Sequence, residues 1–305
     1  MSAGTVANIS PARAWILAAR PATLPAAAVP VIVGTAAAIG DGANFRLAVF
    51  IATLVCALLI QVGTNFANDY SDFHRGADHE GRLGPLRVTQ SGLITQPTVK
   101  RGIIITFGLA VLVGAALVWV GGLPIMLIGL ASVIAGLAYT GGPYPLGYHG
   151  LGDLFVFLFF GVIAVTGTAY LQSGMWTLFP LLLSVPVGLI VTNILVVNNL
   201  RDLPTDLAAG KRTLATRIGE RATRAQYVVF IALAFMIPTL VGVTNPARRA
   251  LLIVLISAPF GLKLARKVMS GASGRDLNRV LAQTGRLLLF FGLLLSAGAL
   301  LGRST

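Results

Sequence analysis

The chain has 305 residues, of which 56% are apolar and only 11% are charged, and its mean hydropathy is +0.84. A soluble domain carries roughly 25% charged residues, so this composition excludes an ordinary water-soluble fold and indicates a bilayer as the solvent. The net charge is +13, but the basic residues gather at the ends of apolar runs, which favours lipid headgroups over nucleic acid as the partner.

Nine apolar runs are long enough to be transmembrane helices, because about 18 to 25 apolar residues span a bilayer. In chain order they cover 22–40, 46–67, 100–120, 123–140, 153–172, 178–199, 224–243, 247–265 and 281–301. The connections after the second, sixth and eighth runs are long and polar. We therefore expect an all-α membrane protein, a bundle of about nine transmembrane helices that forms a single domain over 1–305.

The basic residues orient this bundle through the positive-inside rule. If the N-terminus is cytoplasmic, the 23 Lys and Arg residues all fall on cytoplasmic segments except Arg46, Arg248, Arg249 and Arg303. Every Asp and Glu except Asp41 lies on the same side, which the rule itself does not require. We expect a multi-pass protein of the bacterial cell (inner or plasma) membrane, with the N-terminus and the active site cytoplasmic.

A first polar cluster, 65–78, closes the second apolar run. Asn68 and Asp72 are four residues apart, so they share one face of a helix. Gly76 is expected to break that helix and let Asp78 return toward the same face. Polar residues inside apolar helices are costly and mark function, which favours a site over the alternative of solvated loop charges and helix caps.

A second cluster closes the sixth run and repeats this spacing. Asp202 follows Asn198 by four residues, Asp206 follows four later, and Lys211 and Arg212 come next. Because the second and sixth runs have the same direction, we expect both clusters on one membrane face. Carboxylate and amide oxygens suit Mg²⁺, so the facing clusters predict a pair of Mg²⁺ ions around one diphosphate, with Arg and Lys completing the clamp.

A third segment, 139–153, joins the fourth and fifth runs and contains Pro, Gly and aromatic residues but no Lys or Arg. It is interpreted either as a plain turn or as a lid whose aromatic faces stabilise an allylic cation. The single cysteine, Cys56, and the three His residues form no metal-ligand spacing. No P-loop or dinucleotide-binding glycine pattern stands in a strand–helix context.

These motifs resemble the intramembrane prenyltransferases of the UbiA superfamily over nearly the whole chain. Four segments are similar to the 1,4-dihydroxy-2-naphthoate branch of menaquinone biosynthesis: 19–25, 72–78, 139–145 and 210–214. Many superfamily members place the last two Asp of the first motif four residues apart, whereas Asp72 and Asp78 are six apart, as is common in the naphthoate branch. This spacing leaves open whether Asp78 or Asp69 is the better metal ligand.

The resemblance implies Mg²⁺-dependent transfer of a polyprenyl group from polyprenyl diphosphate to 1,4-dihydroxy-2-naphthoate, with loss of diphosphate and CO₂, giving a demethylmenaquinol. The polyprenyl chain would lie in an apolar tunnel that opens to lipid. The implied metal ligands are Asn68, Asp72, Asp78, Asp202 and Asp206. The four Asp of that set and Tyr139 are the implied catalytic residues. The implied substrate-binding residues are Arg20, Asn65, Asn68, Arg75, Asn198, Arg201, Lys211 and Arg212.

Three alternatives remain. Another acceptor, such as 4-hydroxybenzoate, haem or a chlorophyll precursor, would keep the chain within the superfamily. A membrane CDP-alcohol phosphotransferase also uses Mg²⁺ and Asp clusters, but its contiguous Asp-rich run is absent from the sequence. A transporter would be expected to carry polar groups on broken helices at the midplane, whereas these clusters lie at helix ends. The sequence singles out no residue for binding the aromatic acceptor.

Overall fold

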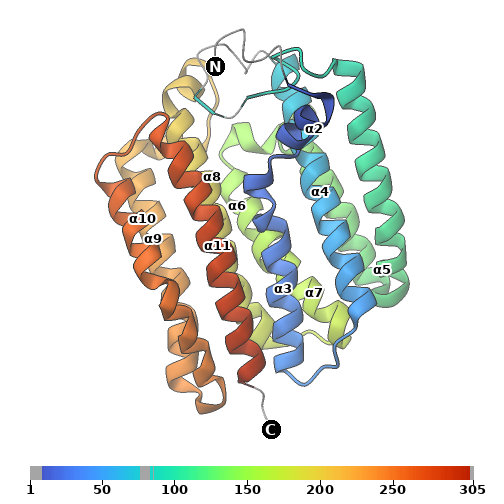
Figure 1. Ribbon diagram of the computed structural model, residues 1–305, viewed down its shortest axis with the longest axis vertical. Helices are drawn as coiled ribbons and strands as arrows, with labels where there is room; N and C mark the ends of the chain where they lie inside the picture. The colour runs from blue at the N-terminus through green and yellow to red at the C-terminus, as the bar shows by residue number, and fades with distance from the viewer. Residues whose placement is uncertain (1–8, 76–82, 85, 303–305) are drawn as a thin grey trace.

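The computed structural model describes residues 9–75, 83–84 and 86–302 (Figure 1). All regular elements in this part of the chain are helices and none is a strand, which confirms the all-α prediction. The first half comprises α2 (Pro11–Ala19), η1 (Pro21–Thr23), α3 (Pro25–Gly40), α4 (Leu47–His74), α5 (Gln96–Ala138), η2 (Leu146–His149) and α6 (Gly152–Val156). The second half comprises η3 (Phe157–Ile163), α7 (Ala164–Ser173), α8 (Leu178–Ala208), α9 (Leu214–Thr244), η4 (Pro246–Ser257), α10 (Ala258–Met269) and α11 (Asp276–Leu301).

Six helices of the described chain are long and apolar enough to cross a membrane, and a bent pair makes up to seven. That pair joins α2 and η1 to α3 with a bend of 51°. The outward faces are apolar: Trp119 is 92% exposed and Leu112 69%. Contiguous apolar exposure of this kind is unfavourable in water, so these faces contact lipid. The chain is an integral membrane protein.

The long helix α5 doubles back on itself. Its 43 residues would extend about 65 Å if straight, but Gly122 has non-helical dihedrals, with φ 66° and ψ −153°. A Cβ on Gly136 would lie 3.6 Å from the Phe107 ring, although these residues would be about 43 Å apart along a continuous helix. The break falls between the predicted runs 100–120 and 123–140, and it brings the second half of α5 back against α4.

Two regions differ from their predicted form. The short helix α2, capped by Ser10, precedes the first predicted run and was not expected from its mixed sequence. The predicted run 247–265 begins as the 3₁₀-helix η4 and continues as α10. Both segments are individually too short to span a bilayer, which is why neither is among the single-helix spans.

Helix α8 is the centre of the bundle, and 78% of its most apolar 18-residue stretch is buried. Its Leu183 and Ile190 belong to the main core cluster with Val29 of α3 and Phe291 of α11. The π-helix η3 approaches α8 so closely that a Cβ on Gly161 would come within 2.5 Å of the Gly188 Cα. Small residues allow this close helix packing in a membrane, and the Phe157 ring of η3 also lies beside Gly188.

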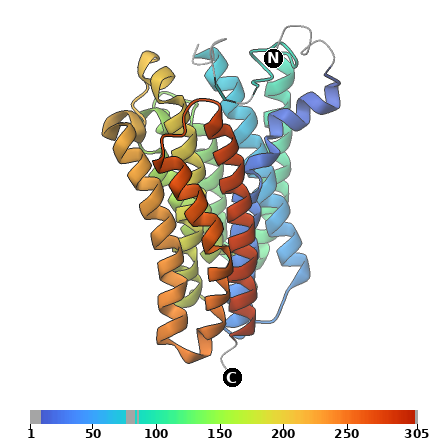
Figure 2. The same ribbon diagram turned by 60° about the vertical axis from the view of Figure 1, so that its left-hand side comes forward.

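The C-terminal ends of α4 and α8 lie at the same end of the bundle. Figures 1 and 2 both show these two ends at the top of each view, where α2 also lies, while the C-terminal end of α11 lies at the bottom. The connection 139–151 reaches the same upper end. We call it the site end, because the two predicted acidic clusters are there.

Candidate active site

The first acidic cluster lies on the last turns of α4, where two connecting segments contact it. Asp72 is buried, and its Oδ2 atom is paired with the Arg87 guanidinium. The Tyr148 hydroxyl donates a 2.6 Å hydrogen bond to Asp72 Oδ1. Arg87 comes from the segment before α5, and Tyr148 from η2. The Asp72 carboxylate is therefore neutralised and oriented by groups that only the tertiary fold brings to it.

Asp69 has a different role, although it is also buried. Its two oxygens accept hydrogen bonds from the backbone N–H groups of Val88, at 3.1 Å, and Thr89, at 3.0 Å. This carboxylate fixes the turn that carries Arg87. The other predicted ligand of this cluster, Asp78, lies outside the described residues.

The second cluster lies on the last turns of α8. Arg201 donates to both Asp202 oxygens, with Nε 2.7 Å from Oδ1 and Nη2 2.5 Å from Oδ2. The same guanidinium donates to Asn198 Oδ1 at 2.7 Å and to Asn278 Oδ1 of α11 at 2.8 Å. Arg201 is 1% exposed, and all three nitrogens of its guanidinium group donate to these partners. In this structure it orients Asp202 and Asn198 rather than facing a cavity.

Tyr148 connects the two clusters. While its hydroxyl bonds Asp72, its ring lies 4.6 Å from the Lys211 ammonium nitrogen. Lys211 is in turn 3.6 Å from Asp206 Oδ1. The backbone N–H of Arg212 donates to the Tyr148 carbonyl at 3.0 Å. A continuous chain of polar and cation–π contacts thus joins the end of α4 to the end of α8.

The predicted lid, 139–153, is fastened to α4 by hydrogen bonds. Arg75 donates through Nε to the Thr140 carbonyl at 3.1 Å, and its Nη2 bonds the Gly142 carbonyl. The Thr140 hydroxyl donates to Asn68 Oδ1 at 2.7 Å. Arg75 therefore positions the connection over the first cluster.

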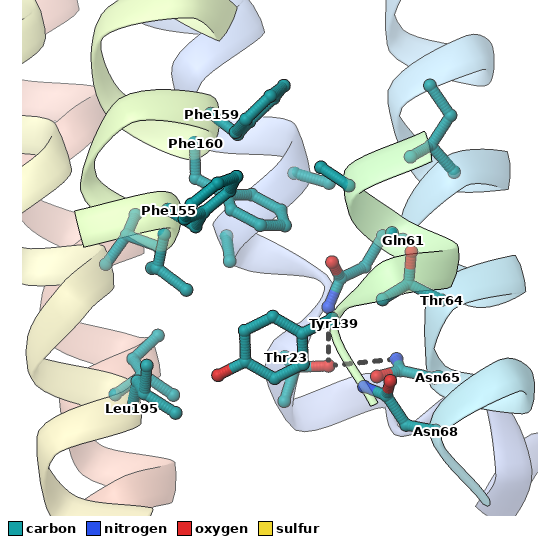
Figure 3. Close-up of a pocket in the computed structure, with 18 of the residues that line it drawn as sticks. Thr23, Gln61, Thr64, Asn65, Asn68, Tyr139, Phe155, Phe159, Phe160 and Leu195 are labelled. Atoms are coloured by element: carbon teal, nitrogen blue, oxygen red, sulfur yellow. Dashed lines mark hydrogen bonds between the residues drawn. The ribbon is translucent and has the colours of Figure 1, made fainter. Parts of the chain in front are cut away.

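A cavity of about 270 Å³ lies between the two clusters. Asn68 of the first cluster and Asn198 of the second both line it, together with Arg20, Asn65 and Tyr139. Figure 3 shows an aromatic wall of Phe155, Phe159 and Phe160 facing a polar wall of Gln61, Thr64, Asn65 and Asn68. The cavity therefore offers polar groups on α4 and apolar surface from α6 and η3.

Tyr139 lies in the wall of this cavity, just after α5 ends (Figure 3). Burial raises the pKa of its phenol, and the carboxylates of Asp153, Asp72 and Asp206 raise it further. Gly152 permits the close packing, because a Cβ there would come within 2.9 Å of the Tyr139 hydroxyl. Tyr139 thus remains a neutral phenol at every physiological pH, and a neutral ring can face a cation.

Arg20 enters the cavity wall from a strained turn. With φ 52° it is the one non-glycine residue at positive φ among those the structure describes, and it ends α2 where η1 begins. A left-handed conformation at such a residue costs free energy and is frequent at functional sites. Asn65 supports this turn, because its amide donates to the Ala19 carbonyl at 3.0 Å.

The predicted site residues thus separate into two groups. Those that line the cavity are Arg20, Asn65, Asn68, Tyr139 and Asn198. Those that lie beyond the cavity, nearer the site end, are Asp72, Arg75, Arg201, Asp202, Asp206, Lys211 and Arg212. Asp72 and Asp202 are each about one helical turn past the Asn of their cluster, so the charged groups form a layer over the polar end of the cavity.

Four residues of the site were not predicted from the sequence. Arg87 lies in the connection before α5, Tyr148 in the short helix η2 of the predicted lid, and Asn278 in the first turn of α11, so no spacing links them to the acidic clusters. Gln61 did carry a signal: it is four residues before Asn65 on the same helix face, a polar residue within an apolar run.

The donor set of the charged layer is suited to a hard cation. It offers carboxylate and amide oxygens, the ligands that Mg²⁺ takes. No three His, Cys, Asp or Glu side chains converge on one point within the described ranges. Instead, Asp72, Asp202 and Asp206 each face a basic side chain. These residues fit a metal–diphosphate site. In it, Mg²⁺ would bind the carboxylates, and the diphosphate would bind basic side chains that now pair with them.

The sequence matches known proteins over nearly its whole length. The model of the UbiA prenyltransferase family matches residues 27–294. A 1,4-dihydroxy-2-naphthoate octaprenyltransferase of Mycobacterium tuberculosis is 38% identical over 94% of this chain and 96% of that enzyme. The enzyme of the same name from Escherichia coli is also 38% identical, over 98% of this chain and 99% of its own.

The fold is also similar to solved structures. A UbiA homolog from Archaeoglobus fulgidus bound to DMAPP and Mg²⁺ has a TM-score of 0.62 to this chain at 14% identity. That match covers 92% of this chain and 99% of the archaeal one. The family match, the two relatives and the fold agree, and the chain belongs to the UbiA prenyltransferase family.

Proposed function

We propose that this protein transfers a polyprenyl group from polyprenyl diphosphate to 1,4-dihydroxy-2-naphthoate, releasing diphosphate and CO₂ and giving a demethylmenaquinol. The observation that carries the proposal is the cavity shared by Asn68 and Asn198. It has acidic clusters at one end and apolar walls below, as an amphipathic prenyl diphosphate requires. The acceptor follows from the two relatives named for dihydroxynaphthoate, each 38% identical over nearly the whole chain.

The charged layer would bind the diphosphate by exchanging partners. Mg²⁺, when bound, neutralises the diphosphate and makes it a better leaving group. Asn68, Asp72, Asp202, Asp206 and Asp78 would hold two such ions. The basic partners of these carboxylates, Arg87 and Lys211, would turn to diphosphate oxygens, with Arg20, Arg75 and Arg212 as further donors. Arginine suits this task because its fork matches phosphate oxygens.

Asn65, Asn198 and Arg201 would contribute by orientation. Asn65 holds the Arg20 turn through the Ala19 carbonyl. Arg201 holds Asn198 and Asp202 in one geometry. Preorganised polar groups of this kind need no rearrangement when charge develops in the reaction.

The chemical step is a displacement at the allylic carbon. Its C–O bond breaks with both electrons leaving on the diphosphate, and the ring carbon that carries the carboxylate attacks the allylic cation. The C–CO₂ bond then breaks, and its electrons restore the aromatic ring, so no side chain has to remove a ring proton. The neutral Tyr139 ring would stabilise the cation, and the walls at Phe155 and Phe159 would keep out the water that quenches it.

We also infer that the whole chain is one domain with nine membrane crossings. The count takes α2–α3 as one crossing, α5 as two, α6–α7 as one and η4–α10 as one, with α4, α8, α9 and α11. The basic residues of the site end support a cytoplasmic active site in a bacterial membrane. Reporter fusions at residue 92 and at residue 210 would both report the cytoplasm, and a periplasmic signal from either would overturn this orientation.

The test of the proposed reaction is a product assay on purified protein. It would contain Mg²⁺, a long-chain polyprenyl diphosphate and either 1,4-dihydroxy-2-naphthoate or 4-hydroxybenzoate. We expect a prenylated naphthoquinol and CO₂ from the first acceptor alone. Product from 4-hydroxybenzoate alone would keep the mechanism and change the acceptor, and no product from either would reject the proposal.

A further inference from the structure

One atom in the cavity wall has no role in the reaction described above. Gln61 is 7% exposed and lines the cavity. Its Oε1 atom is buried and has no hydrogen-bond partner among the residues that the structure describes. A buried acceptor without a partner is costly and calls for an explanation.

The hydrogen-bond network fixes which atom of Gln61 is left over. The single hydrogen of the Thr23 hydroxyl goes to the Arg20 carbonyl, at 2.9 Å. Thr23 Oγ1 can then only accept, and it does so from Gln61 Nε2 at 3.1 Å and from Asn65 Nδ2 at 3.3 Å. Rotating the Gln61 amide would place two acceptors against each other. The amide nitrogen therefore faces Thr23, and the carbonyl oxygen is left without a donor (Figure 3).

The position of this oxygen excludes the prenyl diphosphate as its partner. A hydrocarbon chain has no donor, and an ionised diphosphate offers only acceptors. Gln61 precedes Asn68 by seven residues on the same face of α4, so it lies about 10 Å deeper along the helix. It is therefore well removed from the carboxylates that would hold the metal.

An aromatic hydroxyl fits the position. The walls opposite Gln61 are the rings of Phe155, Phe159 and Phe160 (Figure 3), which suit the faces of a flat bicyclic ring. In 1,4-dihydroxy-2-naphthoate the 1-hydroxyl lies beside the carboxylate and bonds to it. The 4-hydroxyl alone keeps a free hydrogen to donate.

We infer that Gln61 Oε1 accepts a hydrogen bond from the 4-hydroxyl of the aromatic acceptor and so selects hydroxylated rings. This inference rests on the proposed function and names the acceptor subsite of the same cavity. With the hydroxyl at Gln61, the carboxylate-bearing carbon points toward Asn68 and Asn198, where the allylic carbon would lie.

The test compares two ligands on three proteins. The ligands are 1,4-dihydroxy-2-naphthoate and 1-hydroxy-2-naphthoate, which lacks the 4-hydroxyl and is to be measured as a competitor of the first. The proteins are the wild type, Gln61→Met and Gln172→Met. Gln172 is the matched control, because it is also buried in a membrane-spanning helix but bonds the Arg46 backbone at the opposite end.

We expect Gln61→Met to raise the KM of the dihydroxy acceptor about tenfold, as for the loss of one buried hydrogen bond. The KM of the prenyl diphosphate and the inhibition constant of 1-hydroxy-2-naphthoate should change less than about twofold. The Gln172→Met protein should keep all three constants. The wild type itself should prefer the dihydroxy ligand about tenfold, a result that does not depend on how the variants fold.

Two results would overturn the inference: equal weakening of both ligands in Gln61→Met, or no preference in the wild type. The proposed function has a separate readout, which is wild-type turnover of 1,4-dihydroxy-2-naphthoate. If that turnover is absent, the proposed function fails, and calorimetric titration of the same two ligands into wild type and Gln61→Met decides the role of Gln61 alone.

Discussion

Buried ion pairs stand at both ends of this bundle, and they are built differently. At the end opposite the site, Arg248 pairs with Asp41 at 2.6 Å. It also donates to the carbonyls of Gly40 and Gly302, each at 3.0 Å, and lies 3.8 Å above the Phe179 ring. Its partners are mostly backbone and core, so this pair fastens α3, η4 and α11 together.

At the site end the pairs join side chains to side chains. Arg87 faces Asp72 and Lys211 faces Asp206, and the Lys211 ammonium group also lies against the Tyr148 ring. A ligand with negative oxygens can replace a carboxylate as the partner of such a cation, whereas it cannot replace a carbonyl that belongs to a helix end. Burial alone therefore does not separate a structural ion pair from a functional one.

The largest expected effect is loss of reaction on removing a site-end carboxylate. Asp72→Ala or Asp202→Ala should lower kcat at least about 1,000-fold, because a metal ligand supplies several kcal/mol of transition-state stabilisation. The protein should still insert and elute as a folded species. The measurement is turnover in the product assay, with EDTA-treated wild type as the reference for complete loss. A near wild-type rate in either variant would contradict the site.

The opposite end should respond in stability rather than in chemistry. Arg248→Met leaves the half-buried Asp41 carboxylate without its cationic partner, and removing one member of a buried pair costs about 3–5 kcal/mol. We expect a clearly lower thermal unfolding midpoint in detergent, while the KM values of the surviving folded protein stay within about twofold. Altered KM values at unchanged stability would show that the two ends are not separate in function.

Tyr148→Phe tests a single hydrogen bond within the site end. It removes the hydroxyl that orients Asp72 but keeps the ring beside Lys211. The loss of one hydrogen bond to a charged group, about 1.5–3 kcal/mol, predicts a kcat/KM roughly 10- to 100-fold lower, mainly through the apparent affinity for Mg²⁺. A magnesium titration of the rate measures this, and Tyr144→Phe, an exposed tyrosine of the same connection, is the control.

The smallest effect is expected at Thr177. Its hydroxyl donates to Asp41 Oδ2 at 2.7 Å, so Thr177→Val should lower stability by about 1 kcal/mol and leave turnover unchanged. The thermal midpoint and the product assay, run side by side, measure both. A loss of turnover here would mean that the opposite end affects the reaction.

The sequence predicted those parts of the molecule that depend on local pattern. The lengths of the apolar runs located the helices, and the boundary between runs 100–120 and 123–140 separated the two halves of α5. The spacing of Asn68 and Asp72, repeated at Asn198 and Asp202, predicted that these two helix ends come together, and Asn68 and Asn198 do line one cavity. These features depend only on residues that lie close together in the sequence.

Such local patterns do not predict contacts between segments that are distant in the sequence. Arg201 was predicted to bind substrate, but its position is set by Asn278 on α11, and no spacing links the two. Arg87 and Tyr148 reach Asp72 from connecting segments whose course depends on the folded bundle. The orientation of Gln61 follows from a hydroxyl on η1, which only the bend between α2 and α3 brings near.

The central claim is that the two acidic clusters act together on one Mg²⁺–diphosphate. The most direct test is equilibrium binding of a non-reactive prenyl thiodiphosphate to wild type, Asp72→Ala and Asp202→Ala, each with Mg²⁺ and with EDTA. The wild type should bind the analogue only with Mg²⁺, and both variants should lose that binding. Wild-type affinity in either variant, or wild-type binding that is equal in EDTA, would contradict it.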